Sequence, residues 1–292
     1  MADQAGRESI EIEGFLSIRS ASVQLRQLNV LVGANGAGKS NFVRAFELLG
    51  RLVDEELGLF VGLNGGASTL LNDGGERRIR IRANGDPNSY EAILIPAAND
   101  ELIFGDERGY YRTLRHPEPY EQHFGSGHRE TRSHEQARSR PNRVASYVLD
   151  LLRGCRVYHF HDTSVDAPVK RMVPTADNLA LRNDAGNLAS VLLRLRDSGD
   201  PAEQAAYRRI NGNIRQIAPF FRDFVLDPDE RSDRIRLKWN QVGSDAIFSA
   251  QQLSDGTLRF MCLATLLLHP RLPAVVVLDE PELGLHPYAI TR

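Results

Sequence analysis

The feature that most constrains this chain is an octapeptide near its N-terminus, Gly33-Ala34-Asn35-Gly36-Ala37-Gly38-Lys39-Ser40. It matches the pattern G-x-x-x-x-G-K-[ST] in full. The segment Val23–Val32 before it becomes almost continuously apolar, as in a strand covered on both faces, and an amphipathic helix is expected from about Ser40 to Leu57. A glycine-rich turn between a strand and a helix surrounds phosphate groups with backbone amides. The sequence therefore predicts an α/β fold built around a polyphosphate-binding loop.

The residue types in this loop suit a triphosphate bound together with Mg²⁺. Glycines allow positive φ angles and a close approach of N–H groups to phosphate oxygens. Lys39 is placed to reach the β- and γ-phosphates and to assist catalysis, and Ser40 to ligate Mg²⁺. The residues expected to bind the nucleotide here are Gly33, Asn35, Gly36, Ala37, Gly38, Lys39, Ser40 and Asn41. The competing interpretation is an ordinary glycine turn, which the flanking strand and helix disfavour.

A second motif is a pair of acids at the end of an apolar strand. Val275–Leu278 is continuously apolar, and Asp279 and Glu280 follow it directly. A parallel position beside the strand that precedes the phosphate loop would bring Asp279 to Mg²⁺ and turn Glu280 toward a water attacking the γ-phosphate. Hydrolysis needs one carboxylate as metal ligand and one as general base. We therefore predict Asp279 as a metal ligand and Glu280 as a catalytic residue.

Charge and hydropathy exclude some classes of function. The chain has 36 basic and 38 acidic side chains, and a net charge of −2 does not suit a polybasic nucleic-acid coat protein. No apolar stretch is long enough to cross a bilayer, and the two cysteines, Cys155 and Cys262, form no disulfide framework. We therefore expect a cytoplasmic protein without a membrane partner.

Between the two motifs, the sequence patterns change several times. Alternating segments predict an antiparallel β-meander at Ile79–Ala83, Tyr90–Ile95 and Glu101–Phe104. Residues 105–143 are polar and contain His116, His123, His128 and His134, so we expect a mobile, solvated insertion there. Further elements are expected at Val144–Leu152, Asn187–Arg196, Pro201–Ile217 and Ser254–Leu268 (helices) and at Arg156–Phe160 (strand).

These patterns predict a nucleotide-binding core formed by both ends of the chain. Its first half covers residues 1–57 and its second half residues 251–292. Residues 58–160 are expected to form the meander with its insertion, and residues 161–250 a region of helices and small strands.

Two motifs near the C-terminus carry a resemblance to a known family. Leu253-Ser254-Asp255-Gly256-Thr257 opens an apolar helix, with Ser254 as a suitable N-cap. Downstream, Leu278–Pro287 reads Leu-Asp-Glu-Pro-Glu-Leu-Gly-Leu-His-Pro. Together with the opening strands around Ile12–Gly33, these motifs resemble ABC-type ATPases of the SMC/RecF group. The resemblance covers the whole chain and is closest to bacterial predicted ATPases of the AAA_21 type, which include ATPase subunits of some anti-phage systems.

The resemblance implies a specific arrangement of the site. Ser254 and Gly256 would bind the γ-phosphate of ATP held by a second copy, giving a head-to-tail homodimer with ATP and Mg²⁺ as cofactors. His161-Asp162-Thr163-Ser164 stands where the family has its Gln loop, so His161 or Asp162 is expected near Mg²⁺ or the attacking water, with Asp162 as a metal ligand. The implied fold is an ABC/SMC-like P-loop core that continues past Arg292, so the C-terminal part of the core is expected to be missing from this sequence.

Several functions agree with these observations. The first is ATP hydrolysis coupled to dimerisation in a DNA-linked process, either repair or anti-phage defence, with DNA as a partner implied only by the resemblance. The alternative is a nucleotide-sensing scaffold that hydrolyses little and controls an effector nuclease. A transporter motor is disfavoured by the long separation of Lys39 and Ser254. A GTPase is disfavoured because no Asn-Lys-x-Asp motif occurs, and a small-molecule kinase does not explain the Ser254 helix.

Overall fold

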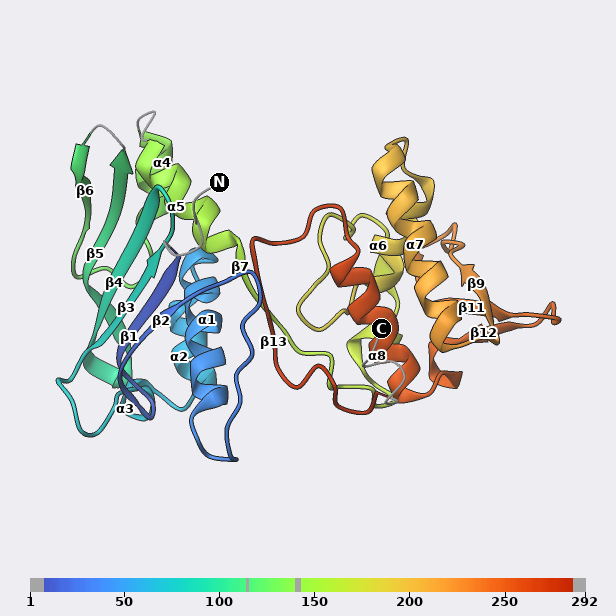
Figure 1. The fold of residues 1–292 in the computed structure, drawn as a ribbon, viewed down its shortest axis with the longest axis horizontal. Coiled ribbons are helices and arrows are strands. Elements are labelled where there is room, and N and C mark those ends of the chain that lie inside the picture. Colours follow the sequence, from blue (N-terminus) through green and yellow to red (C-terminus); the bar gives the residue numbers. More distant parts are fainter. Residues whose placement is uncertain (1–7, 114–115, 140–142, 286–292) are drawn as a thin grey trace. The chain divides into compact units, whose positions relative to one another are not determined.

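A computed structural model describes residues 8–113, 116–139 and 143–285, so His286 and Pro287 of the acidic motif lie outside the described residues. The chain divides into two compact units, which are treated separately below (Figure 1). The first unit comprises Met1–Val157 and Pro273–Val277, and the second comprises Tyr158–Leu272 and Leu278–Arg292. Among the described residues, no helix combines the length and apolar character needed to span a membrane.

The first unit is built on a six-stranded antiparallel sheet in the order β2-β1-β3-β4-β5-β6. Its strands are β1 (Ser9–Phe15), β2 (Ile18–Gln24), β3 (Ile79–Asn84), β4 (Asn88–Pro96), β5 (Leu102–Thr113) and β6 (His116–Gly125). Ile12 pairs with Ile81, and Ile81 pairs with Ala92, so apolar side chains line one face across three strands. The predicted β-meander is confirmed, and it continues beyond the expected strands.

Helices cover the apolar face of this sheet (Figure 1). They are α1 (Lys39–Val53), α2 (Leu57–Leu63), α3 (Ala67–Leu70), α4 (Ser133–Ser139) and α5 (Arg143–Arg153). The predicted helix from Ser40 to Leu57 ends four residues early, and Leu57 instead begins α2. Phe46, Leu49 and Val53 of α1 are buried in the core, as their spacing predicts.

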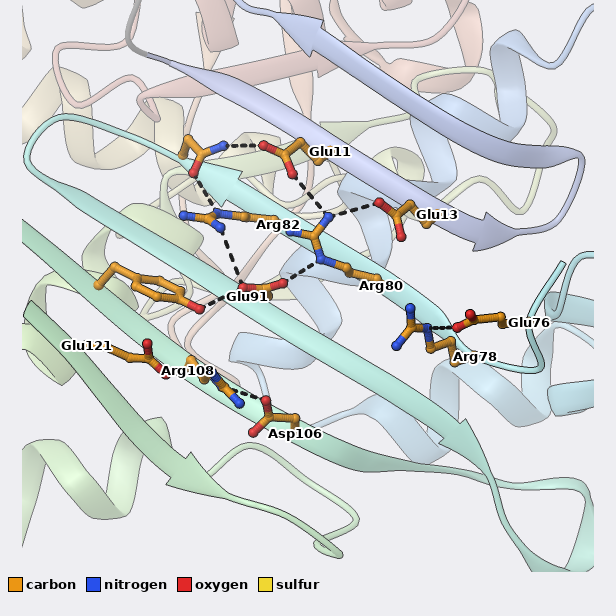
Figure 2. A network of polar contacts seen from close by, with 12 residues as sticks. Glu11, Glu13, Glu76, Arg78, Arg80, Arg82, Glu91, Asp106, Arg108 and Glu121 are labelled. Carbon is orange, nitrogen blue, oxygen red and sulfur yellow. Dashed lines mark hydrogen bonds and ion pairs between the residues drawn. The ribbon is translucent and has the colours of Figure 1, made fainter. Parts of the chain in front are cut away.

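The opposite face of the sheet carries an ion-pair network (Figure 2). The guanidinium of Arg80 contacts Glu91, Glu11 at 3.1 Å and Glu13 at 3.0 Å. Burial alone would raise the pKa of Glu91, but hydrogen bonds from Tyr110 and Arg80 lower it overall. Because these charges are only partly buried, we attribute to the network the alignment of neighbouring strands more than a large gain in stability.

Residues 105–143 differ from the prediction of a mobile, solvated insertion. β5 continues to Thr113, and β6 and α4 lie in this segment. Its Glu107 is fully buried and accepts hydrogen bonds from the Tyr90 hydroxyl at 2.9 Å and the Arg132 amide at 3.0 Å. His128 Nε2 lies 2.9 Å from the same carboxylate. Polar side chains can be buried here because each carboxylate oxygen of Glu107 has partners.

Two of the four histidines therefore contribute to packing. The ring of His128 stacks on Phe104 with centroids 4.6 Å apart, and His134 Nε2 lies 2.7 Å from the carbonyl oxygen of Val53. His123 is exposed and contacts Asp106. The side chain of His116 lies outside the described residues.

The second unit combines helices with two small antiparallel sheets. Its helices are α6 (Leu188–Asp197), α7 (Pro201–Ile217) and α8 (Asp255–Leu267), close to their predicted bounds. One sheet has the order β12-β11-β9, with β9 (Phe221–Val225), β11 (Lys238–Gln241) and β12 (Ile247–Ser249), and the other pairs β8 (Val173–Pro174) with β10 (Arg234–Ile235). Trp239 packs against Phe221 and Phe248, which gives the larger sheet an aromatic core. Short 3₁₀ turns occur at Ala98–Asp100 in the first unit and at Pro168–Lys170 and Ala250–Gln252 in the second.

The apolar segment before the glycine loop is not the predicted buried strand. β2 ends at Gln24, no strand is formed by residues 25–38, and Leu28, Val30 and Val32 are 80%, 74% and 88% exposed. A strand is covered on both faces only when neighbouring strands and helices surround it. The described residues supply no strand partner to this segment, so its side chains remain in contact with solvent.

The strand that carries the acids has a different neighbour from the predicted one. β13 (Val275–Leu278) pairs with β7 (Cys155–Tyr158) instead of with a strand before the glycine loop. The Val275 amide donates to the Gly154 carbonyl oxygen at 2.7 Å. The strand predicted at Arg156–Phe160 thus exists as β7, which begins one residue earlier and ends two residues earlier than expected.

We predict that Glu107→Gln lowers the free energy of unfolding of the first unit by about 2–4 kcal/mol at pH 7. Burial alone would raise the pKa of Glu107, but hydrogen bonds from His128, Thr131 and Arg132 lower it overall. A carboxylate with a lowered pKa stabilises the fold above its unfolded-state pKa, and that contribution is lost as the pH falls. The wild type and Glu107→Gln should therefore converge in stability as the pH falls through the lowered pKa of Glu107.

Urea unfolding followed by circular dichroism at several pH values measures this difference. Fluorescence cannot replace it, because the single tryptophan, Trp239, lies in the second unit and does not report on the first. His128 and Tyr90 face Glu107 in both proteins, so the difference isolates the carboxyl group. Glu121→Gln, which alters an exposed carboxylate on β6, is the control. Equal losses for the two variants at pH 7 would contradict the prediction.

Candidate functional site

The glycine loop adopts the backbone conformations that its sequence predicts. Gly36 and Gly38 have φ angles of 81° and 90°, in the left-handed region that favours glycine. Gly38 is also the N-cap of α1, and a Cβ atom there would lie 3.2 Å from the Ser17 hydroxyl oxygen. The first turn of a helix has N–H groups without partners inside the helix. The loop therefore presents the start of α1 as an anion-binding position.

Two side chains hold this loop in shape. The Lys39 ammonium donates to the carbonyl oxygens of Gly33 at 2.7 Å and Ala34 at 3.0 Å, so it lies against the loop that precedes its own helix. Asn41 Nδ2 donates to the Ser17 hydroxyl oxygen at 2.7 Å, which ties the start of α1 to the turn between β1 and β2. The loop is thus preformed around the lysine that sequence reasoning selected.

A polar groove runs beside the start of α1. Residues Leu16, Ser17, Asn41, Ser68, Thr69, Leu71, Asn72, Asp73 and Gly74 line it. Asn72 Nδ2 donates to the Leu16 carbonyl oxygen at 2.6 Å and fixes one wall. Asn41 therefore belongs both to the loop and to this groove. Sequence reasoning included Asn41 but missed the groove, because its walls come from separate segments of the chain.

In the second unit, Ser254 caps α8 as predicted. Its backbone is extended, and its hydroxyl oxygen accepts from the Thr257 amide at 3.3 Å and lies 2.8 Å from the Thr257 hydroxyl. Gly256 sits in the first turn, where a Cβ atom would lie only 2.4 Å from the Gly284 carbonyl oxygen. The structure thus gives a steric reason for this glycine that the sequence pattern could not supply.

The acidic pair follows β13. Asp279 is half-buried, whereas Glu280 is exposed and has a φ angle of 43°. Possible ligand atoms of Asp279, His159 and His161 all lie within 4.8 Å of one another. Sequence reasoning predicted Asp279 and named His161, but it missed His159. The His-x-His spacing is the signal that was available, since alternate residues of an extended segment point to the same side.

Asp162 has a local role in the structure. Hydrogen bonds from the Ser164 hydroxyl and from the Ser164 amide, the latter at 3.0 Å, lower the pKa of its carboxyl group. The three-residue cluster around Asp279 contains His161 and not Asp162. The role of Asp162 as a metal ligand stays a prediction.

The predicted site residues are divided between the two units. The loop residues from Gly33 to Asn41 belong to the first unit. Ser254, Gly256, Asp279, Glu280 and Asp162 belong to the second unit. The predicted approach of Asp279 to a metal held by Ser40 therefore remains a prediction.

We predict that Ser254→Ala lowers the free energy of unfolding of the second unit by about 1 kcal/mol, because the N-cap hydrogen bond is lost. Ser254→Gly should cost only a few tenths of a kcal/mol, since glycine tolerates the N-cap position. Urea titration followed by Trp239 fluorescence measures both values, because Trp239 lies in this unit. The cap would be unimportant if Ser254→Ala were as stable as the wild type.

A comparison with protein families matches a range that contains all of the predicted site residues. The family model AAA_21, described as "AAA domain, putative AbiEii toxin, Type IV TA system", matches residues 28–292. This range contains the glycine loop, the Ser254 motif and the acidic pair. No curated protein sequence matches the chain. The glycine loop and a family match over most of the chain agree with each other, and the chain belongs to the AAA_21 family of nucleotide-binding P-loop ATPases.

Proposed function

We propose that this protein is a Mg-ATP-binding, ABC-type ATPase in which hydrolysis is coupled to head-to-tail dimerisation. The observation that carries the proposal is the preformed loop, with left-handed Gly36 and Gly38 and the Lys39 ammonium held against the carbonyl oxygens of Gly33 and Ala34. These carbonyls keep the lysine in the loop, where its charge favours a polyphosphate.

The residues present fit Mg²⁺ together with ATP. Ser40 is exposed at the start of α1, and hydroxyl and carboxylate oxygens are ligands that Mg²⁺ prefers. Ser40 and Asp279 are the proposed ligands, with Asp162 as a further one. When bound, Mg²⁺ neutralises charge on the β- and γ-phosphates. The amides at the start of α1 bind and orient the phosphates, and Lys39 compensates their charge.

The acid that follows the proposed metal ligand Asp279 has a different proposed role. Glu280, exposed and next in sequence to the proposed metal ligand, is the proposed general base for water. Its backbone has a φ angle of 43°, a conformation that costs energy in a residue with a side chain. Such strain is typical of residues positioned for function, which supports this role.

The second copy is proposed to act through Ser254 and Gly256. The N-terminus of α8 carries a partial positive charge, and Gly256 keeps its first turn free of a side chain. A γ-phosphate held by the partner would be attracted there only while it is present. Hydrolysis then weakens the dimer, so ATP acts as a reversible clamp.

The biological process is proposed from the resemblance, which suits a DNA-linked process, either repair or defence against phage. The family description names a putative toxin of a type IV toxin–antitoxin system and does not mention DNA. The arginines on the polar face of the first sheet do not by themselves support a DNA surface. Arg80, Arg82 and Arg108 are each paired with carboxylates there (Figure 2).

A second candidate function is a nucleotide-sensing scaffold that barely hydrolyses ATP and controls an effector nuclease. The bond from the Ser164 amide to Oδ1 of Asp162 is the observation that favours it, because this bond gives the residue a local structural role beside the proposed one in binding metal. The two functions differ in turnover, since the scaffold does not depend on a general base.

We predict that Glu280→Gln reduces ATP turnover by about 10²-fold or more, because the general base is lost. It should also accumulate as a dimer in Mg-ATP, because hydrolysis no longer releases the clamp. Sedimentation velocity with and without Mg-ATP, together with phosphate release, measures both effects. Glu282→Gln, which alters another exposed carboxylate of the same motif, is the control and should behave like the wild type.

The outcomes separate the candidates. Equal turnover and equal mass for the wild type and Glu280→Gln, with ATP bound by both, would favour the scaffold. A Glu280→Gln protein that stays monomeric in Mg-ATP would contradict the shared site. Adding Ser254→Ala to Glu280→Gln should remove the ATP-dependent dimer.

A further inference from the structure

The second unit contains a cluster of three possible metal ligands, which the proposed ATPase role explains only in part. His159 and His161 follow β7, and Asp279 follows the neighbouring strand β13. Their possible ligand atoms lie within 4.8 Å of one another, and all three residues are half-buried. Two imidazoles and one carboxylate form a donor set unlike the all-oxygen set that Mg²⁺ prefers. We propose that these three residues form a binding site for a divalent transition-metal ion such as Zn²⁺.

The local structure brings these donors together. His159 and His161 are alternate residues directly after β7, and their ligand atoms lie close enough to share one ion. The His159 amide donates to the Asn183 carbonyl oxygen at 2.9 Å, which fixes the backbone at the first ligand. The two imidazole rings have centroids 6.1 Å apart and tilt by 43°.

The distances between the three possible ligand atoms are close to those around a single bound ion. Two donor atoms bound to zinc at about 2.1 Å can be no more than about 4.2 Å apart. The observed limit of 4.8 Å therefore requires only small side-chain rotations. A cavity of about 10 Å³ adjoins the cluster and is lined by His161, Asp279 and Glu280 among other residues. That volume is on the scale of one water molecule, and a bound water is a usual further ligand of zinc.

Arg259 connects the segment that contains His161 with the acidic motif. Its Nη2 donates to the His161 carbonyl oxygen at 2.8 Å, and its Nη1 donates to the Leu283 carbonyl oxygen at 2.7 Å. The guanidinium is thus bound to backbone carbonyls on the segment of a ligand and on the acidic motif. It positions both segments, and these carbonyls partly compensate its charge.

The inference deepens the proposed function and rests on it in one respect, because Asp279 is also the proposed ligand of the ATP-bound metal. Three protein ligands leave at least one position open on zinc, which a water or a phosphate oxygen can take. The site would therefore favour a transition metal over Mg²⁺, since imidazole nitrogen is a good ligand for Zn²⁺ and a poor one for Mg²⁺.

Calorimetric titration with Zn²⁺ alone and with Mg²⁺ alone, in the absence of nucleotide, tests the site on the full chain. We expect one Zn²⁺ per chain, with an affinity that falls about 100-fold in the double variant His159→Gln, His161→Gln. Mg²⁺ affinity should change less than about 3-fold, because imidazole contributes little to it. His123→Gln removes an exposed imidazole of the first unit and should leave Zn²⁺ binding unchanged.

A second measurement does not depend on how the variant folds. Pulsed electron paramagnetic resonance of wild-type protein with one equivalent of Mn²⁺ should show coupling to imidazole nitrogen. Wild-type protein that binds no Zn²⁺, a double variant that binds it as the wild type does, or bound Mn²⁺ without nitrogen coupling would each overturn the proposal.

A third variant separates this inference from the ATPase proposal. Lys39→Ala removes the phosphate-binding ammonium and should keep Zn²⁺ affinity. If the wild type binds Zn²⁺ but not ATP, the metal site stands and the proposed function fails. If the wild type binds ATP but not Zn²⁺, the proposed function stands and the metal site fails.

Discussion

The glycine loop depends on the interaction between the Lys39 ammonium and the carbonyl oxygens of Gly33 and Ala34. It closes the loop around the positive charge of the Lys39 side chain. The loop can close only because Gly36 and Gly38 adopt left-handed conformations, and Gly38 also lies against Ser17. A loop that is ordered beforehand loses less conformational entropy when it binds phosphate, so the cost of binding is reduced.

In the second unit, helix α8 lies close to the backbone of two other segments. Gly256 allows the Gly284 carbonyl to pass the first turn of α8, while Arg259 from the same helix binds the Leu283 and His161 carbonyls. The start of α8, the acidic motif and the His-x-His segment are therefore mechanically joined.

The sequence predicted the meander, the helices α5 to α8 and the Ser254 cap, because each follows from local periodicity or local hydrogen bonding. It was wrong where the outcome depends on distant partners. Val30 and Val32 read as a buried strand but lack strand partners among the described residues, and Glu107 read as solvated but finds donors on other segments. His159 was missed because only the pairing of β7 with β13 brings it to Asp279.

Calorimetric titration of the intact chain with Mg-ATP is the most direct test of the central claim, that the loop at residues 33–40 binds a nucleoside triphosphate. We predict one ATP per chain, an affinity reduced at least about tenfold by Lys39→Ala, and no change for Lys238→Ala, which alters a lysine of β11 in the other unit. Wild-type protein that takes up no ATP at millimolar concentration, or equal affinity in Lys39→Ala, would contradict it.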